Sequence, residues 1–296
     1  MLQLKFEIIG KSVQGASHVR KGIECQDAFK KVELEDGTII LAVADGHGSE
    51  SCPFSSTGAK SATNVFCDIM SEYHQKYADN LEMLATYLNR EGETRVAQAI
   101  DAEWKRRIVK QHKRLKRQIP VTNDGTQDVQ SVYKQYGTTL LGLMVTDAFL
   151  FAFQLGDGDI GYVDVNGYEA VVEGDKILGV ETHSLSREAA WEKAISIVRR
   201  TRPIRPSMYM VSSDGFSNSY KDEPSFRATC IDYFNMVNEH GTAAIRANLP
   251  AWLTETSEMG CGDDITMLIA YFTAEPGPNT EQASKPKKES EDSIDA

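Results

Sequence analysis

The chain lacks any long hydrophobic run. None of its apolar stretches exceeds six residues, as in IILAVA at Ile39–Ala44, whereas a membrane-spanning helix needs about 20 apolar residues. The first residues, MLQLKFEIIGK, hold neither a basic leader nor a small-residue cleavage site. We therefore expect a protein without a membrane partner or a secretory signal, located in the cytoplasm.

Cysteine is also scarce. The five cysteines form an odd set and contain no CxxC pair, which argues against a disulfide framework and against a zinc knuckle. We expect reduced thiols.

The chain also lacks the positive charge of a nucleic-acid-binding protein. Its 32 Lys and Arg stand against 43 Asp and Glu, so the formal net charge is −11, and binding to nucleic acid needs a basic surface. The segment 105–117 is an exception, with eight Lys or Arg and no acid. Two interpretations stay open for it: a solvated helix face with Trp104, Ile108 and Leu115 turned inward, or a docking surface for an acidic or phosphorylated partner.

Short apolar segments predict strands, and segments with helical periodicity predict helices. Apolar residues recur every three or four positions over 62–73 and over 97–115. A further helix is expected over 187–197. The turns at 146–147 and 156–158 are expected to close hairpins, which favours antiparallel pairing. The predicted strands are 39–44, 138–145, 148–154, 161–165, 208–211 and 265–272.

Aspartates stand at the ends of four of these strands. Asp45 follows LAVA, Asp157 follows FAFQLG, and Asp214 follows YMVSS, while Asp263 and Asp264 precede ITMLIAY. A carboxylate is costly in an apolar setting unless its charge is compensated, so we expect the strand ends to converge. Oxygen ligands without cysteine suit Mg²⁺ or Mn²⁺. A single Asp-Gly pair is more simply a turn, but the whole set favours a metal site.

The order of these motifs resembles that of metal-dependent protein phosphatases of the 2C type, in particular bacterial single-domain serine/threonine phosphatases. The resemblance implies an α+β fold, a four-layer α-β-β-α sandwich of two antiparallel sheets flanked by helices. It implies a catalytic domain over 1–273 with a flap-like insertion at about 175–205, and the composition of 274–296 predicts a disordered acidic tail. The matching motifs are Gln26-Asp27-Ala28, Asp45-Gly46-His47-Gly48, Gly137-Thr138-Thr139, Gly156-Asp157, Ser213-Asp214-Gly215 and Asp263-Asp264-Ile265-Thr266.

The resemblance also implies roles for single residues around two or three Mn²⁺ or Mg²⁺ ions. Asp45 would bridge two ions, Asp27 would act as a ligand directly or through water, and Asp157 would hold a third ion. His47 would protonate the departing serine or threonine oxygen, a role that suits an imidazole near neutral pH. The implied metal ligands are Asp27, Asp45, the Gly46 carbonyl, Asp157, Asp214 and Asp263.

Two positions depart from the family pattern. Members of the family usually carry an arginine that grips the phosphate five residues before the motif aspartate, and this chain has Gly22 there. At Asp264 many relatives have asparagine, so this chain has one more negative charge. We expect the substrate phosphate to be bound instead by Arg20, His18 or Lys21. Further candidates for substrate contact, in the flap-like insertion, are Arg199, Arg200, Arg202 and Arg205.

The reaction that the resemblance implies is hydrolysis of phosphoserine or phosphothreonine in a protein, by water that divalent cations activate. The expected partner is a phosphorylated protein, the target of a serine/threonine kinase, and the chain is expected to be a monomer. Motifs of other phosphatase chemistries, CxxxxxR, GxxxxGK[ST] and GxSxG, do not occur. Two alternatives stay open: a phosphatase or phosphodiesterase for another phosphoester, and a catalytically weak pseudophosphatase that binds phosphoproteins.

Overall fold

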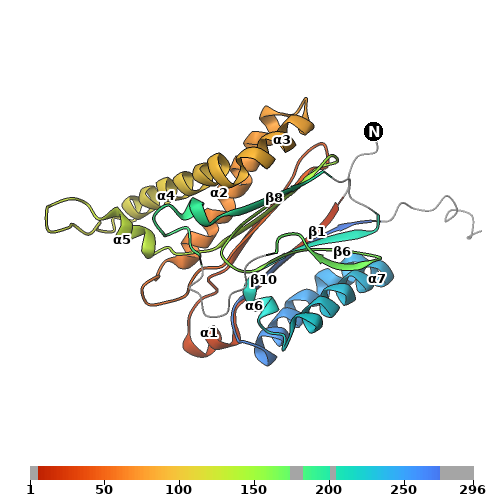
Figure 1. The fold of residues 1–296 in the computed structure, drawn as a ribbon. Helices are drawn as coiled ribbons and strands as arrows, with labels where there is room; N and C mark the ends of the chain where they lie inside the picture. The colour runs from red at the N-terminus through yellow and green to blue at the C-terminus, as the bar shows by residue number, and fades with distance from the viewer. Residues whose placement is uncertain (1–5, 174–182, 201–204, 274–296) are drawn as a thin grey trace, which may run out of the picture.

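Two five-stranded antiparallel sheets, stacked face to face, form the centre of the molecule (Figure 1). The computed structural model describes residues 6–173, 183–200 and 205–273. The first sheet has the strand order β1-β10-β9-β6-β7 and the second the order β2-β3-β4-β5-β8. Their bounds are β1 Phe6–Val13, β2 Ala28–Glu33, β3 Ile39–Ala44, β4 Leu140–Val145, β5 Leu150–Leu155, β6 Asp159–Asp164, β7 Gly167–Ala170, β8 Ile195–Arg199, β9 Ser207–Ser212 and β10 Ile265–Phe272.

Helices cover the outer face of each sheet (Figure 1). Helices α2 to α4 pack on the second sheet, whereas α6 and the long α7 pack on the first. Helix α7 is broken at Gly241, where the backbone leaves the helical region. The bounds are α1 Ala16–Lys21, α2 Ser55–Lys76, α3 Leu81–Glu91, the π-helical turn η1 Gly92–Val96, α4 Ala97–Arg114, α5 Val129–Lys134, the 3₁₀ turn η2 Ala190–Lys193, α6 Asp214–Ser217 and α7 Glu223–Met259.

Strand β3 is apolar at every position, without the usual alternation of apolar and polar residues, because both of its faces are covered. All six of its residues are buried. Ile39, Leu41 and Val43 pack into the layer between the two sheets. The alternate residues, Ile40, Ala42 and Ala44, face the helices α2 and α4 instead. Because successive side chains point to opposite faces of a strand, a strand covered on both faces reads as a continuous apolar run.

The four-layer α-β-β-α sandwich predicted from the sequence is confirmed, and so are all six predicted strands and two of the helices, with small shifts at their ends. No helix in the described part of the chain is both long enough and apolar enough to cross a lipid bilayer. The predicted tail at 274–296 and parts of the predicted insertion, 175–182 and 201–204, lie outside the described residues.

Two local predictions were wrong. The turn at 156–158 does not close a hairpin, because β5 belongs to the second sheet and β6 to the first, so this turn crosses from one sheet to the other. The predicted helix over 187–197 is instead η2 followed by β8, which pairs with β5. Ile195 and Ile197 point toward the layer between the sheets while Val198 packs on the other side, and this alternation is that of a strand.

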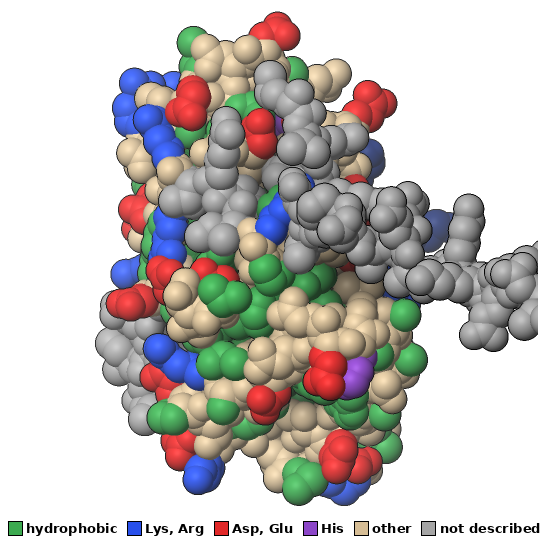
Figure 2. All heavy atoms as spheres, turned by 90° about the vertical axis from the view of Figure 1, so that its right-hand side faces the viewer, with side chains coloured by type: hydrophobic (Ala, Val, Ile, Leu, Met, Phe, Trp, Pro, Cys, Tyr) green, Lys and Arg blue, Asp and Glu red, His purple; other side chains and the backbone are tan. Residues whose placement is uncertain are grey.

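The two ends of the sandwich differ in character. Strands β3 and β5 end, and β4 and β10 begin, at the end where α1 and α6 lie (Figure 1). Figure 2 shows the opposite end, where apolar side chains are exposed in the middle of the face and acidic and basic side chains are scattered around them. The aspartates singled out in the sequence all belong to the end with α1 and α6.

Gly58 of α2 provides a test of the packing at that end. A methyl group at position 58 would lie 1.9 Å from the carbonyl oxygen of Tyr136. Alanine normally favours a helix over glycine by up to about 1 kcal/mol, but here we predict that Gly58→Ala lowers the free energy of unfolding by about 3 kcal/mol because the backbones must separate. Urea unfolding measures this. The control Asn64→Ala, on the exposed side of α2, should change stability by less than about 0.5 kcal/mol, and equal stabilities of the two variants would contradict the packing.

Candidate metal centre

A polar cavity of about 200 Å³ opens at the end of the sandwich where these strands meet. Asp45 comes directly after β3, Asp157 from the turn that crosses between the sheets, and Asp214 from the start of α6, two residues after β9. Four aspartates and two histidines thus surround one space. The lining residues are His18, Asp45, Gly46, His47, Gly48, Thr139, Asp157, Asp214 and Asp263.

The backbone of Asp45 is held by two threonines. Its N–H donates to the Thr139 hydroxyl at 2.9 Å, and its carbonyl accepts from the Thr138 hydroxyl and the Thr139 N–H, both at 2.8 Å. Gly46 follows in a crowded position, since a Cβ there would lie 2.8 Å from the Gln26 carbonyl oxygen. The strand end is therefore fixed on both sides, and the Asp45 carboxyl is presented to the cavity.

The carboxyls of Asp45 and Asp214 lie within hydrogen-bonding reach of each other. One oxygen of Asp214 accepts from the Asn218 amide at 2.8 Å, but its buried Oδ1 has no hydrogen-bond donor among the described residues. Burial, followed by repulsion from Asp157, raises the pKa of Asp214 to about 6. Burial and repulsion from Asp27 and Asp214 raise the pKa of Asp45 well above its ordinary value. Two carboxylates so close together need a proton or a cation between them.

Asp27 lies behind the cavity rather than on its wall. Its Oδ2 accepts from the Ser213 hydroxyl at 2.7 Å, while its buried Oδ1 has no donor among the described residues. Burial is the main reason that the pKa of Asp27 is raised to about 7, with the Asp264 carboxylate adding to it. The neighbouring Gln26 is buried and accepts a hydrogen bond from Ser55. Asp27 is therefore the charged residue of the Gln26-Asp27-Ala28 motif that lies near the site.

Asp264 has a structural partner at each oxygen. It accepts backbone hydrogen bonds from Gly15 at 2.6 Å and from Gln26 at 2.7 Å, and thereby ties three segments that are distant in the sequence. Nδ1 of His18 lies 2.9 Å from its Oδ1, without the alignment of a good hydrogen bond. Nε2 of His18 faces the cavity, 4.0 Å from an oxygen of Asp263. The extra negative charge at position 264 therefore ties the start of α1 to the segment at Gln26 and lies beside His18, instead of lining the cavity.

The other cations predicted to bind substrate do not line this cavity. Arg20 and Lys21 are exposed on α1. Arg199 pairs with Glu169, Arg200 donates to the Thr86 hydroxyl, and Arg205 stacks 4.1 Å from the centre of the Phe272 ring, at the far end of β10. The last three therefore point away from the carboxylates, so the expectation that they meet substrate there was wrong. Arg202 lies outside the described residues.

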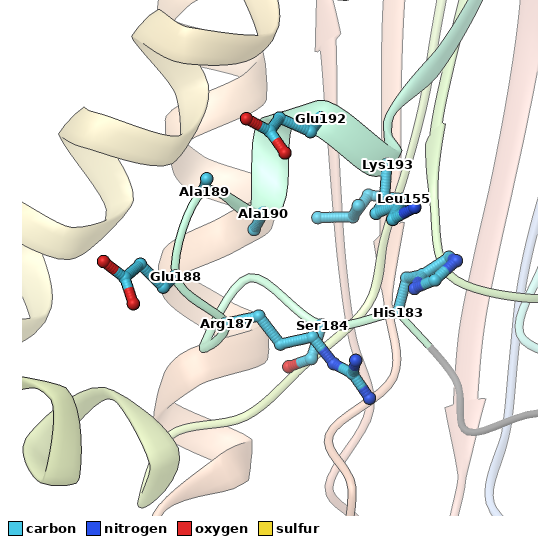
Figure 3. Close-up of a pocket in the computed structure, with 9 residues that line it drawn as sticks. All are labelled: Leu155, His183, Ser184, Arg187, Glu188, Ala189, Ala190, Glu192 and Lys193. Carbon is cyan, nitrogen blue, oxygen red and sulfur yellow. The ribbon is translucent and has the colours of Figure 1, made fainter.

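A second cavity, of about 130 Å³, lies on the other side of the 155–157 turn. It lies near the first, because a Cβ at Gly156 would be within 2.8 Å of both Thr139 and the His183 carbonyl. Figure 3 shows the basic side chains of His183, Arg187 and Lys193 on one side of it, with Glu188 and Glu192 pointing away from them. The segment is held by Lys105, whose ammonium donates to the Arg187 carbonyl at 2.8 Å. Sequence reasoning missed this cavity.

The donor chemistry of the first cavity fits divalent cations. Among the described residues, no group of three or more His, Cys, Asp or Glu side chains is arranged so that it could hold a metal ion as it stands. The fit rests instead on the donors present: oxygens of aspartates and of backbone, no thiol, and buried oxygens of Asp27 and Asp214 that have no donor. Oxygen donors of this kind suit Mg²⁺ or Mn²⁺.

A family model described as Protein phosphatase 2C matches residues 14–254. The chain belongs to the protein phosphatase 2C family. No curated protein sequence matches it.

Solved structures of phosphatases share this fold at low sequence identity. A serine/threonine phosphatase of S. agalactiae has a TM-score of 0.55 at 15% identity, with 90% of this chain and 99% of that one covered. The catalytic domain of PstP, solved with two manganese ions, has a TM-score of 0.52 at 16% identity, with 92% and 100% covered. PppA of Pseudomonas aeruginosa has a TM-score of 0.53 at 16% identity, with 91% and 99% covered. The phosphatase 2C family predicted from the order of the motifs is confirmed.

The raised pKa values predict how this phosphatase 2C domain responds to pH without metal. Asp27 and Asp214 titrate near 7 and 6 in the folded chain but near 4 when unfolded. Their contribution to stability is present below pH 4 and is lost as the pH rises through 6 to 7. In EDTA we therefore expect the free energy of unfolding to fall by about 4 kcal/mol between pH 5 and pH 8, measured by urea unfolding.

Added Mn²⁺ or Mg²⁺ should stabilise the protein more at pH 8 than at pH 5, because metal and protons compete for the same oxygens. The variant Asp214→Asn should show a smaller loss of stability in EDTA, since it removes one of the titrating groups. A stability in EDTA that does not change with pH, or an equal gain from metal at both pH values, would contradict the clustering of the carboxylates.

Proposed function

We propose that this phosphatase 2C domain is an active metal-dependent protein serine/threonine phosphatase. The observation that carries the proposal is the arrangement of Asp45, Asp157, Asp214 and Asp263 around one cavity together with two histidines. Carboxylates that a chain gathers around one cavity in this way repel each other and need compensating cations. A folded protein gains no stability from such an arrangement without them, so a function in metal binding explains it best.

The residues that would hold two or three Mn²⁺ or Mg²⁺ ions come from both sheets. Asp45 and the Gly46 carbonyl follow β3, and Asp157, Asp214 and Asp263 follow or precede strands that meet them at the cavity. Asp27 would act from behind, through the oxygen that has no donor. When bound, the cations would lower the pKa of a water molecule and neutralise charge on the phosphoryl group.

His47 is placed to give a proton to the departing serine or threonine oxygen. It lines the cavity, and its backbone N–H donates to the Gly137 carbonyl at 3.2 Å. Its ring packs over Gly137, where a Cβ would lie only 2.7 Å from the ring carbon Cδ2. The absence of a side chain at residue 137 therefore sets where the imidazole lies, and a fixed imidazole beside the reacting group is what general acid catalysis requires.

His18 is the best placed of the three residues that we proposed for the substrate phosphate. Its side chain is only 13% exposed, with Nδ1 lying 2.9 Å from Asp264 and Nε2 lying 4.0 Å from Asp263 at the cavity. Arg20 and Lys21 follow His18 on α1 with exposed side chains and would reach a phosphate only at the rim. The proposal therefore gives His18 the phosphate contact and gives Arg20 and Lys21 a supporting charge.

The solved relatives support this proposal. PstP is a serine/threonine protein phosphatase whose catalytic domain was solved with two manganese ions, and RsbX, with a TM-score of 0.50 at 13% identity, was solved with magnesium. The proposed partner is accordingly a phosphorylated protein, dephosphorylated at serine or threonine by a monomeric enzyme. The five cysteines, all free thiols, fit the reducing conditions of the cytoplasm.

Phosphate release from a phosphothreonine peptide and from p-nitrophenyl phosphate tests the proposal. Wild type should need Mn²⁺ or Mg²⁺ and lose activity in EDTA. Asp214→Asn should lower kcat/KM by at least about 100-fold because it removes a charged metal donor. The matched control Asp232→Asn makes the same change at an exposed carboxylate of α7 and should leave the rate unchanged. In the same assay His18→Gln should raise KM for the phosphopeptide more than Arg20→Ala or Lys21→Ala.

Three results would lead to another conclusion. Turnover that EDTA does not affect, or that Asp214→Asn leaves intact, would overturn the role of the carboxylates. Binding of the phosphopeptide without phosphate release under any ion would identify a pseudophosphatase. Faster hydrolysis of bis-p-nitrophenyl phosphate than of the phosphopeptide would identify a phosphodiesterase.

A further inference from the structure

The last two turns of α4 form a basic face that the catalytic proposal does not use. Lys110, Lys113 and Arg114 are exposed, and so is Lys116 directly after the helix. Residues 110, 113 and 114 lie on one side of the helix because they are three and four positions apart. The opposite side, with Trp104 and Ile108, is buried in the core. We call the four exposed cations, Lys110, Lys113, Arg114 and Lys116, the α4 basic face.

The cationic side chains in the two halves of α4 differ in whether they form ion pairs. In the first half each cation has a carboxylate: Lys105 pairs with Asp101, Arg106 with Glu103, and Arg107 with both Asp68 and Glu103. In the part of the chain that the structure describes, no carboxylate forms an ion pair with a residue of the α4 basic face. Like charges three and four positions apart repel each other, so the second half keeps a local positive charge in a chain of net charge −11.

The acids nearest in sequence do not neutralise this face. Asp124 accepts the backbone N–H of Thr126 within its own turn, and Asp128 caps α5 by accepting the N–H of Ser131 at 3.0 Å. The helix C-terminus itself favours cations in its last turn, which accounts for a single lysine or arginine there. It does not account for four that extend over two turns and past the end.

This face is joined to the catalytic end of the molecule. Arg117, one residue beyond the face, stacks with its guanidinium 3.3 Å from the centre of the Phe54 ring and donates to the Tyr136 hydroxyl at 2.7 Å. Phe54 immediately precedes α2 and closes the loop that begins at Asp45. Trp104 ties the same helix to α2 by donating to the Gly58 carbonyl at 3.0 Å. A ligand on the α4 basic face would therefore lie beside the loop that carries His47.

We propose that the α4 basic face docks an acidic segment of the protein substrate. The proposal rests on the proposed phosphatase activity for the identity of the partner. From Lys110 to Arg114 the helix rises about 6 Å, and Lys116 lies just beyond its end. A short acidic peptide segment matches these four closely spaced cations in charge. A nucleic acid is disfavoured because the rest of the chain is acidic and would repel a longer polyanion.

Binding of a labelled, unphosphorylated peptide rich in Asp and Glu to the full chain in EDTA tests this proposal without relying on catalysis. We expect Lys113→Glu/Arg114→Glu to weaken binding at least tenfold, and added salt to weaken binding to wild type. The matched control Lys221→Glu/Arg246→Glu makes the same charge change at exposed residues of the α7 side and should bind like wild type. With p-nitrophenyl phosphate, both double variants should keep the wild-type kcat/KM, whatever its value.

Several results would overturn docking of an acidic segment. One is equal binding by the two double variants, and another is equal binding by wild type of the acidic peptide and of a neutral peptide of the same length. Tighter binding of duplex DNA or of anionic lipid vesicles, lost in Lys113→Glu/Arg114→Glu, would assign the face to those ligands. If neutralising Glu289, Glu291, Asp292 and Asp295 in the full chain tightened peptide binding tenfold, the chain's own end would be the occupant. If the wild-type protein did not hydrolyse p-nitrophenyl phosphate, that result would count against the phosphatase proposal and not against docking of an acidic segment.

Discussion

The fold must accommodate the mutual repulsion of several carboxylates that lie close together at one end of the sandwich. Asp27, Asp45 and Asp214 are drawn together by strands of both sheets, and their pKa values rise because burial and neighbouring charges disfavour ionisation. Hydrophobic packing in the layer between the sheets stabilises the fold and offsets the unfavourable repulsion among these carboxylates. The aspartates sit at strand ends because that is where a rigid sheet can aim a charged group without burying it in the apolar layer. Under the proposed function, a bound divalent cation would replace this repulsion by attraction between the cation and the carboxylates.

The surroundings of the site consist largely of groups that hold these charges in place. Thr138 and Thr139 fix the backbone of Asp45, Ser213 donates to Asp27, and Asp264 joins α1 to the strand end and faces His18. Because α1 is tied through one buried carboxylate, the position of His18 depends on the same set of contacts as the proposed metal ligands. On the outer side, the stack of Arg117 on Phe54 connects the α4 basic face to this set. Substrate docking and chemistry are thus proposed to use neighbouring parts of one end of the sandwich.

Much of the fold and site could be predicted from the sequence, where a local pattern carries the information. β3 and β10 read as strands because they are continuous apolar runs, and the motif order identified the family. The sequence does not predict β2, because one face is exposed and its lysines mask the alternation. It predicts a helix in place of β8, because the pairing of β8 with β5 is not encoded locally. The role of Asp264 could not be foreseen, since its donors, Gly15 and Gln26, lie more than 230 residues away. Nor does the sequence show which cations reach the site, because reach depends on where α1 and β8 lie in the fold.

Anomalous diffraction from crystals grown with Mn²⁺ tests the central claim most directly, because it locates the metal without assuming a substrate. The account predicts at least two manganese peaks in the cavity, with one of them between Asp45 and Asp214, and it predicts that Asp45→Asn loses that peak while the fold is kept. Calorimetric titration of the same proteins should give matching stoichiometries. A wild-type crystal without manganese at these aspartates, or one in which Asp45→Asn binds the ions equally well, would contradict the claim that the converging strand ends form a metal centre.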